Sequence, residues 1–368
     1  MRASITSLIR ITASSHARTW LVTLLTLCAL SVHAQDGQDA SRQPPDRPAL
    51  GPIVSQNLHP MYAPFVQLPA RSARTVGQNS IATFIHESYG NNYFFHLDAD
   101  DDDGGDTLIS ELDTEASYTT LGLTWGIHPR AEVNGSLLFV SHFDGVFDPA
   151  IEAYHDLLGL PNAGRGKRPQ NEFSLYFKND SGELLDEEGP IMDITALNIE
   201  PRVNLVESED ERFLLTVGST VKLSLSSPAV TATNSGADVA LRAFAEYRWP
   251  RADLSASTGV AYLSQPDYIP DASFRPWIIP FTASFEWMLS DGFSLGTTIS
   301  GNTSPFDLGY DRTDRFTATA TMGGIFALGE QTQLQIATSQ EFFTFAATDV
   351  AVHLALSYAF AEPWEPRQ

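Results

Sequence analysis

From about Ser80 to Phe360 the sequence repeats short runs in which apolar and polar side chains alternate. The run at 212–226 is the clearest, because apolar residues dominate one face: Phe213, Leu215, Val217, Val221, Leu223 and Leu225. A period of two places alternate residues on opposite faces of a β-strand. Runs of about ten residues that alternate in this way and recur many times are typical of a transmembrane antiparallel β-barrel. The pattern therefore predicts an all-β fold of this class.

Twelve such runs are expected, and together they predict a barrel of about 12 strands between residues 77 and 360. They cover approximately 80–96, 107–127, 131–141, 193–206, 212–226, 238–249, 254–264, 276–289, 293–301, 316–328, 332–343 and 349–360. The connections alternate between short and long, as 128–130 and 141–192 illustrate. Short periplasmic turns and longer outer loops characterise outer-membrane barrels, and an even strand number returns both ends to the periplasm. A soluble β-sandwich has no reason to sort its loops in this way.

Aromatic residues gather at the ends of the predicted strands. Trp125, Trp249 and Trp287 stand beside short connections, whereas Tyr262 and Trp277 stand beside long ones. Amphipathic rings at both rims form the interfacial girdles of membrane barrels. The last predicted strand alternates up to a terminal aromatic residue, which is the kind of strand that the barrel-assembly machinery recognises. A tail, 361–368, follows it.

The N-terminus has the features of a secretion signal. Three arginines accompany an apolar stretch at 21–32, and Val32-His33-Ala34 fits the rule for cleavage before the next residue. That stretch is too short to span a bilayer as a helix. Cys28 raises a lipoprotein alternative, although Leu27 stands where lipidation requires a small residue. We expect residues 1–34 to be a signal peptide, whose removal leaves no cysteine.

Two further segments precede the first strand. Residues 35–49 are polar and predict a disordered linker. Residues 50–76 combine four prolines with many apolar residues, so they need burial but cannot form a regular strand or helix. We expect this segment to enter or seal the periplasmic mouth as a plug. The residues expected to act there are Pro64, Phe65, Arg71 and Arg74, with either arginine pairing to Glu200, Glu246 or Glu286. The alternative is a periplasmic ledge that docks a partner protein.

Several fragments together are familiar. They are Gly51-Pro52-Ile53-Val54-Ser55-Gln56-Asn57, Leu121-Gly122-Leu123-Thr124-Trp125-Gly126, the stretch from Asp144 to Pro161, Val221-Lys222-Leu223, and the stretch from Asp349 to Phe360. With these fragments the chain resembles the proteobacterial family called domain of unknown function 3187, whose members look like outer-membrane barrels. The resemblance covers about 50–360 and implies the fold and the Gram-negative outer membrane as location. It implies no reaction and no ligand.

Charge narrows the range of partners. The chain has 22 basic and 45 acidic residues, a formal net charge of −23 at pH 7. Nucleic acid is not an expected partner, because binding phosphates requires clustered Lys and Arg. The expected partners are outer-membrane lipids and lipopolysaccharide. The acidic loop from Asp98 to Asp106 suits divalent cations that bridge lipid phosphates, although its spacing departs from an EF-hand. A solvated acidic loop tip is the alternative. No cofactor is expected.

The polar faces of the predicted strands point to the lumen. They carry charges of both signs: Glu200, Arg202, Lys222, Asp238, Arg242, Glu246, Arg248, Glu286, Glu341 and His353. Mixed signs suggest paired charges in a partly filled interior. Twelve strands fall between the filled eight-stranded barrels and the open porins. A narrow or gated channel for passive transport of a small solute follows, with a surface receptor or lipopolysaccharide-interacting barrel as the alternative.

The long connection at 141–192 predicts a short helix. Apolar residues recur there at spacings of three and four: Phe147, Ile151, Tyr154, His155 and Leu158. We expect this stripe to fold inward as a constriction, with packing on the outer rim as the alternative. The basic cluster at 165–168 follows it and is a weak signal for anionic ligands.

An outer-membrane lipid hydrolase is the enzymatic rival. Residues 292–296 match the G-x-S-x-G pattern around Ser294. That motif requires a turn from a strand into a helix, however, and here it leads from a tight turn into a strand. The nearest histidine in a short turn is His128, and no histidine and glutamate stand at the i, i+4 spacing of a zinc helix. We expect no catalytic and no metal-binding residues.

Overall fold

The computed structural model describes residues 51–99, 106–158, 171–179, 182–187, 190–210, 212–225, 236–266, 269, 271–308, 314–341 and 348–360. The predicted signal peptide, linker and C-terminal tail lie outside these ranges, as do most of the acidic loop and the whole basic cluster at 165–168. No helix among the described residues is long and apolar enough to cross a membrane.

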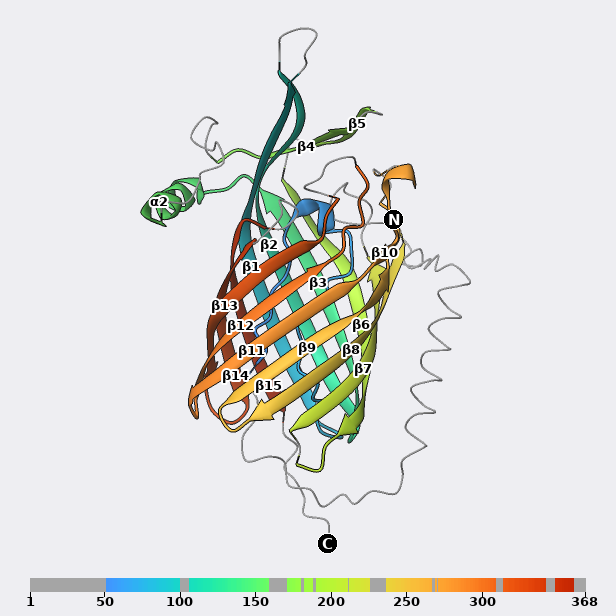
Figure 1. The fold of residues 1–368 in the computed structure, drawn as a ribbon, viewed down its shortest axis with the longest axis vertical. Helices are drawn as coiled ribbons and strands as arrows, with labels where there is room; N and C mark the ends of the chain where they lie inside the picture. The colour runs from blue at the N-terminus through green and yellow to red at the C-terminus, as the bar shows by residue number, and fades with distance from the viewer. Residues whose placement is uncertain are drawn as a thin grey trace, which may run out of the picture. The chain divides into compact units, whose positions relative to one another are not determined.

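Twelve of the described strands form a closed antiparallel barrel (Figure 1). They are β1 (Ile81–Ala99), β2 (Asp106–His128), β3 (Ala131–Phe143), β6 (Ile191–Glu207), β7 (Phe213–Ser224), β8 (Ala237–Trp249), β9 (Ala252–Tyr262), β11 (Pro280–Ser290), β12 (Phe293–Asn302), β13 (Thr317–Ala327), β14 (Thr332–Glu341) and β15 (Val350–Phe360). Each strand pairs with its neighbours in the chain, and β1 also pairs with β15, which closes the ring. A further short strand, β10 (Trp277–Ile278), pairs with β9. The predicted class is confirmed.

The alternation of the sequence divides the wall into two faces. Outward side chains are apolar and exposed, as Leu241 at 53% and Met322 at 62% illustrate. Their neighbours along the strands, such as Arg242 at 3% and Thr321 at 0%, are polar and buried inside. An apolar surface that surrounds the molecule on every side is stable only in contact with lipid.

The connections alternate in length as the sequence predicts. The turn between β13 and β14 is one of the short ones, and Gly329 adopts a φ of +127° there, in the region that favours glycine. The long connections lie at the opposite end of the barrel, at the top of Figure 1. The connection between β3 and β6 also contains a hairpin that the alternation did not predict, β4 (Ser174–Asn179) with β5 (Gly182–Glu187). This hairpin extends the sheet beyond the rim, because β4 pairs with β2.

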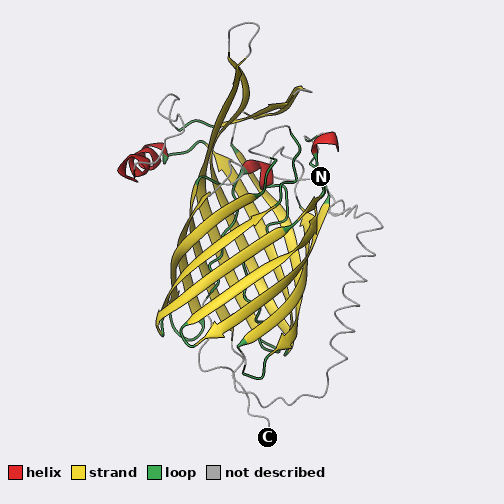
Figure 2. Ribbon diagram, in the orientation of Figure 1, coloured by secondary structure: helices red, strands yellow, loops and turns green. Residues whose placement is uncertain are grey.

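The helix predicted in this connection exists as α2 (Asp148–Leu158), but it does not narrow the lumen. Figure 2 shows α2 beside the barrel rather than over its mouth, so the prediction of an inward constriction is wrong. The reason lies in the residues before it. The carboxylate of Glu115, on the outer face of β2, accepts the N–H groups of Val146 and Phe147 at 2.8 and 2.6 Å. The ring of Phe147 also packs on Tyr89, with centroids 5.2 Å apart, on the outer face of β1.

Of the predicted constriction residues, Phe147 is therefore half-exposed on the outside, and Ile151 is buried at 9% exposure. The side chains of Tyr154, His155 and Leu158 lie outside the described part of the structure. Asp148 begins the helix, accepts the N–H of Asn171 at 2.8 Å, and places a negative charge at the positive end of the helix dipole.

Residues 51–76 run through the lumen as an open hairpin (Figure 1, blue). The ascending arm, 51–59, starts in the lower half of the barrel and rises. The apex is a 3-10 turn, η1 (Pro60–Tyr62), near the outer end. The descending arm, 64–76, returns to the end with the short turns, where Asn79 donates its N–H to the carbonyl of Gly126 at 2.8 Å before β1 begins.

Candidate functional site

The descending arm is bound by charged side chains from β3, β6, β7 and β8. Glu200 is the centre of one group: its carboxylate lies 2.9 Å from the Arg71 guanidinium of the arm and 2.7 Å from that of Arg242. Arg242 also donates to the carbonyl of Pro69 at 3.0 Å. Thr220 adds a hydroxyl donor to Glu200 at 2.9 Å. Wall and arm thus share one network of charge-assisted hydrogen bonds.

Arg202 extends this network toward the periplasm. It lies 3.3 Å from Glu132 and donates to the backbone carbonyls of Ser72 and Arg74. Its guanidinium also stacks over the ring of Phe244, with the carbon 4.7 Å from the centroid. Arg202 is only 2% exposed, so these acceptors replace the water that its charge would otherwise require.

Glu246 anchors the lower end of the same arm. Its carboxylate accepts the N–H of Ala73 at 3.0 Å and pairs with Arg74 at 3.3 Å. Arg248 lies 3.1 Å from Glu246 and 3.2 Å from Asp253, and so links β8 to β9. These contacts fix the descending arm just before it leaves the barrel.

Lys222 and Asp238 bind the upper end of the arm. Lys222 donates to the carbonyl of Pro64, and its ammonium lies 3.8 Å from the carboxylate of Asp238. Asp238 accepts the N–H of Val66 at 2.7 Å and that of Ser264 at 2.8 Å. Both charged residues are fully buried. The descending arm is therefore bound by buried charges from its top to its bottom.

The ascending arm has a different kind of partner. Gln335 accepts the N–H of Val54 at 3.0 Å and donates to the carbonyl of Pro52 at 3.2 Å. Thr298 donates to the carbonyl of Ile53 at 3.2 Å. Each of these wall side chains is uncharged.

Further up, the partners of the ascending arm remain neutral. Gln56 donates to Thr120 at 2.9 Å, and Leu58 donates its N–H to Thr348 at 2.8 Å. Ser88 donates to Gln56 at 3.3 Å and lies 2.7 Å from a ring nitrogen of His353. The arm thus rests on amides, hydroxyls and imidazole rings.

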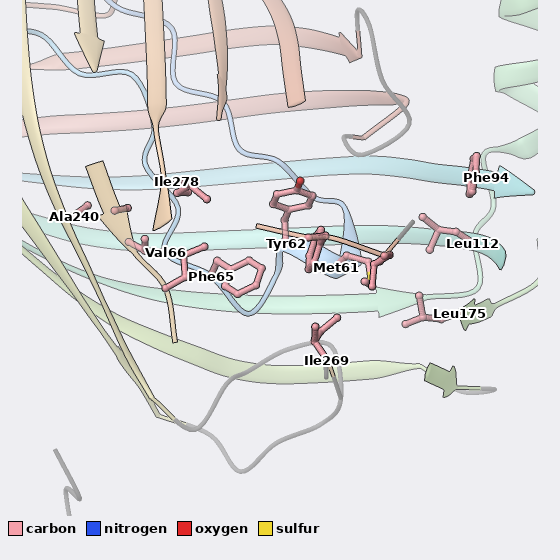
Figure 3. Close-up of a cluster of buried hydrophobic side chains, with 14 residues drawn as sticks. Met61, Tyr62, Phe65, Val66, Phe94, Leu112, Leu175, Ala240, Ile269 and Ile278 are labelled. Carbon is pink, nitrogen blue, oxygen red and sulfur yellow. The ribbon is translucent and has the colours of Figure 1, made fainter. Parts of the chain in front are cut away.

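An apolar cluster surrounds the apex at the outer end of the lumen. Figure 3 shows Tyr62 and Phe65 of the hairpin among side chains from the wall and the outer connections, including Ile269. The Tyr62 and Phe306 rings meet edge to face with centroids 5.3 Å apart. Phe65 stacks on Phe274 at 5.9 Å. Because these groups exclude water, the apex cluster covers the hairpin from the outside.

Across the lumen from the charged strands, hydroxyl side chains face one another on neighbouring strands. The upper hydroxyl row consists of Ser257, Thr282, Ser300 and Thr319, on β9, β11, β12 and β13. The lower hydroxyl row consists of Ser255, Ser284, Thr298, Thr321 and Ser339, and continues to β14. Hydrogen bonds of 2.8, 2.9 and 3.0 Å join Ser257 to Thr282, Ser284 to Thr298 and Ser300 to Thr319.

A cavity of about 60 Å³ lies between the hairpin and the upper hydroxyl row. Residues 55–57 and 65–69 line one side, while Ser300, Asn302 and Thr319 line the other. A buried water requires about 10–15 Å³ in this measure, so the cavity has room for a few waters but not for a sugar-sized solute.

The residues predicted to line the lumen all lie inside the barrel. Those that are buried are Glu200, Arg202, Lys222, Asp238, Arg242, Glu246, Glu286 and His353, whereas Arg248 and, at the upper end of β14, Glu341 are partly buried. The structure brings most of them together around the descending arm, but Glu286 lies apart, near Gly51. Sequence reasoning missed Glu132 and Asp253, each one residue inside a strand start. It also missed both hydroxyl rows, whose signal is Ser or Thr at alternate positions of successive strands.

The structure gives no support to the enzymatic alternative. Ser294 is fully buried, and among the described residues its hydroxyl has no hydrogen-bond partner. The surrounding motif forms the turn from β11 into β12, without the helix of a nucleophile elbow. No group of three or more His, Cys, Asp or Glu side chains suited to a metal ion occurs within the described ranges.

Comparison with known proteins shows the family to which the chain belongs. The model of a family described as a protein of unknown function, DUF3187, matches residues 21–360. The chain belongs to this family. No curated protein matches it. Among solved structures, this DUF3187 chain is similar to the COG4313 outer membrane channel from Pseudomonas putida F1, with 11% identity and a TM-score of 0.51 over 78% of this chain and 98% of the other.

Two weaker likenesses are to the KdgM porin and to the Pseudomonas putida toluene transporter TodX. The first has 4% identity and a TM-score of 0.40, and covers 76% of this chain and 99% of that one. The second has 7% identity and a TM-score of 0.36, with 77% and 89% covered. At such identities it is the likeness to the COG4313 channel that shows the fold, which is that of a Gram-negative outer-membrane barrel.

Proposed function

We propose that this DUF3187 protein is a passive channel for a small solute, and that displacement of the ascending arm opens it. The observation that carries the proposal is the difference between the two arms of the hairpin. Buried ion pairs bind the descending arm, whereas neutral hydrogen bonds bind the ascending arm. Its fold likeness to an outer-membrane channel adds support.

The energetics of the two arms follow from these contacts. A neutral hydrogen bond contributes about 0.5–1.5 kcal/mol net, because water replaces the partner when the bond breaks. Breaking a buried ion pair by removing one partner costs about 3–5 kcal/mol, because a charge is left without compensation. The polar contacts of the ascending arm can therefore be broken at a lower cost than those of the descending arm. Departure of the ascending arm would join the cavity to the lower lumen.

The chain enters the outer membrane, in this proposal, after cleavage of the signal peptide behind Ala34. The sequence supports this with its arginines, apolar stretch and small residues before the cleavage site. The mass of the intact protein purified from outer membranes is expected to equal that of residues 35–368. A mass that includes residues 1–34 would contradict the cleavage.

Conductance in planar bilayers tests the channel. The full chain is expected to give rare, brief openings, and a variant lacking 51–58 is expected to conduct steadily. Heat-modifiable migration on gels is the control that both barrels are folded. If both proteins are folded and silent, the channel proposal fails, and the alternative of a surface or lipopolysaccharide-binding barrel takes its place.

A further inference from the structure

The two hydroxyl rows form a continuous polar track inside the barrel. Their members are directly opposite on paired strands, and neighbouring strands lie about 4.8 Å apart, so each row is a chain of closely spaced hydroxyls. Strands of such barrels tilt by about 35–45° from the barrel axis. A row perpendicular to the strands therefore climbs the wall, and the two rows together cover a considerable part of the lumen's height.

The chemistry of this track suits an uncharged solute. A hydroxyl both donates and accepts a hydrogen bond, so the rows can exchange their mutual bonds for bonds to the hydroxyls of a solute. The charges of the facing strands do not act strongly on this side, because acids and bases there are paired at 2.7–3.8 Å. An anion on the hydroxyl side would lose its water and meet the buried carboxylate of Glu286, which faces inward from β11, instead of a counter-charge.

Two buried hydroxyls beside this track lack a hydrogen-bond partner within the described part of the chain. Ser55 on the ascending arm lines the cavity at 4% exposure, and Thr321 in the lower row is fully buried. Among the described residues neither Oγ of Ser55 nor Oγ1 of Thr321 has a hydrogen-bond partner. Buried polar groups are almost always satisfied, so these two indicate that water or a solute occupies this side of the lumen.

The ascending arm covers the lower row. Thr298 of that row donates to the carbonyl of Ile53, and a Cβ built on Gly296 of the same strand would lie 2.9 Å from Ile53. When the arm leaves, the lower row becomes continuous with the cavity beside the upper row. The charged network around the descending arm is unaffected by this movement.

We propose that the hydroxyl rows are the solute path, and that they select small uncharged compounds rich in hydroxyl groups over anions of the same size. This inference rests on the proposed channel function. It adds the substrate class and assigns it to the wall of β9 and β11–β14, across the lumen from the ion pairs that bind the descending arm.

Proteoliposomes that contain the full-length protein provide the test. The uptake of glucose is compared with that of gluconate, which has a similar size and a negative charge. Glucose is expected to enter several-fold faster than gluconate. The double variant Thr282→Val/Ser300→Ala changes the upper row, away from the Thr298–Ile53 bond that holds the ascending arm. It is expected to lower glucose uptake about fivefold, the equivalent of one net hydrogen bond. Potassium conductance through the same barrel is expected to change less than twofold.

Thr297→Val is the matched control, because this threonine is in the same strand as Ser300 but faces the outside, where it is exposed. It is expected to leave glucose uptake unchanged. Equal uptake of glucose and gluconate, or a double variant that behaves like the control, overturns the selectivity while the potassium conductance still demonstrates a channel. A protein that passes neither solutes nor potassium overturns both proposals.

Discussion

The two arms of the luminal hairpin, 51–59 and 64–76, differ in the kind of contact that binds them to the wall. The descending arm contacts Glu132, Glu200, Arg202, Lys222, Asp238, Arg242 and Glu246. The ascending arm contacts Ser88, Asn92, Thr120, Thr298, Gln335 and Thr348. The buried ion pairs of the wall require the descending arm. Apart from Glu286 beside Gly51, the wall groups of the ascending arm are neutral, and water can satisfy them. The descending arm is therefore a fixed part of the barrel, whereas in the proposed function the ascending arm is the part that moves.

The largest effect is expected for Arg242→Met. This change leaves Glu200 with one cation fewer and removes the donor to the carbonyl of Pro69, so the free energy of unfolding should fall by about 3–5 kcal/mol. Denaturant-induced loss of heat-modifiable migration measures it. Arg212→Met is the control, because the Arg212–Asp210 pair is exposed and should matter by less than about 1 kcal/mol. Equal losses in the two variants would remove the distinction between the arms.

A pair of leucine truncations compares the arms directly. Leu58 of the ascending arm and Leu214 beside the descending arm are both buried, so each change to Ala should remove about 2–5 kcal/mol of packing free energy. In Leu58→Ala this loss weakens the binding of the arm, and in Leu214→Ala it weakens the barrel itself. Leu58→Ala is expected to raise the frequency of channel opening and to leave the stability of the barrel unchanged. Leu214→Ala is expected to lower stability without more openings. The opposite assignment would reverse the roles proposed for the arms.

Lowering the pH is expected to favour displacement of the ascending arm. Burial, aided by the nearby His142, lowers the pKa of His59 to about 3, so the arm in place keeps this ring neutral. The displaced ring regains a pKa near 6.5 and takes up a proton as pH falls below that value. Between pH 7 and pH 5 the displaced state should gain up to about 2 kcal/mol. More openings at pH 5, and a weaker response in His59→Gln, are the expected result; a pH-independent conductance would contradict it.

The smallest effect is expected for Gln335→Leu, which removes a neutral donor and acceptor from the ascending arm. The arm should lose about 1 kcal/mol of its binding free energy, enough to raise the opening frequency about fivefold. Gln340→Leu is the control on the outer face of the same strand, where the side chain is exposed. If Gln335→Leu opens the channel no more often than Gln340→Leu, the neutral bonds do not hold the arm.

The strands were largely predictable from the sequence, because alternation is a local property. The runs expected at 131–141 and 293–301 correspond to β3 and β12 almost residue by residue. The prediction that Arg71 or Arg74 meets a lumen acid also had a local basis, since a buried cation requires a counter-charge. The contacts found are Arg71 with Glu200 and Arg74 with Glu246.

Other features depend on distant partners and were beyond the sequence. The stripe on α2 shows that one helix face packs, but the side on which it packs follows from Glu115, which lies on another strand. The hydroxyl rows exist only when the register of neighbouring strands is known, since Thr298 meets Ser284 on one side and Thr321 on the other. Each serine or threonine alone looks like ordinary polar lining.

The position of the hairpin in the chain has a consequence for assembly. It is covalently continuous with β1, and the pairing of β1 with β15 joins the first strand of the barrel to the last. We expect the wall to close around a hairpin that is already in place, because the buried charges of β6–β8 need the descending arm as a partner once water is excluded. The descending arm would then act first in the assembly of the barrel, before any opening of the channel.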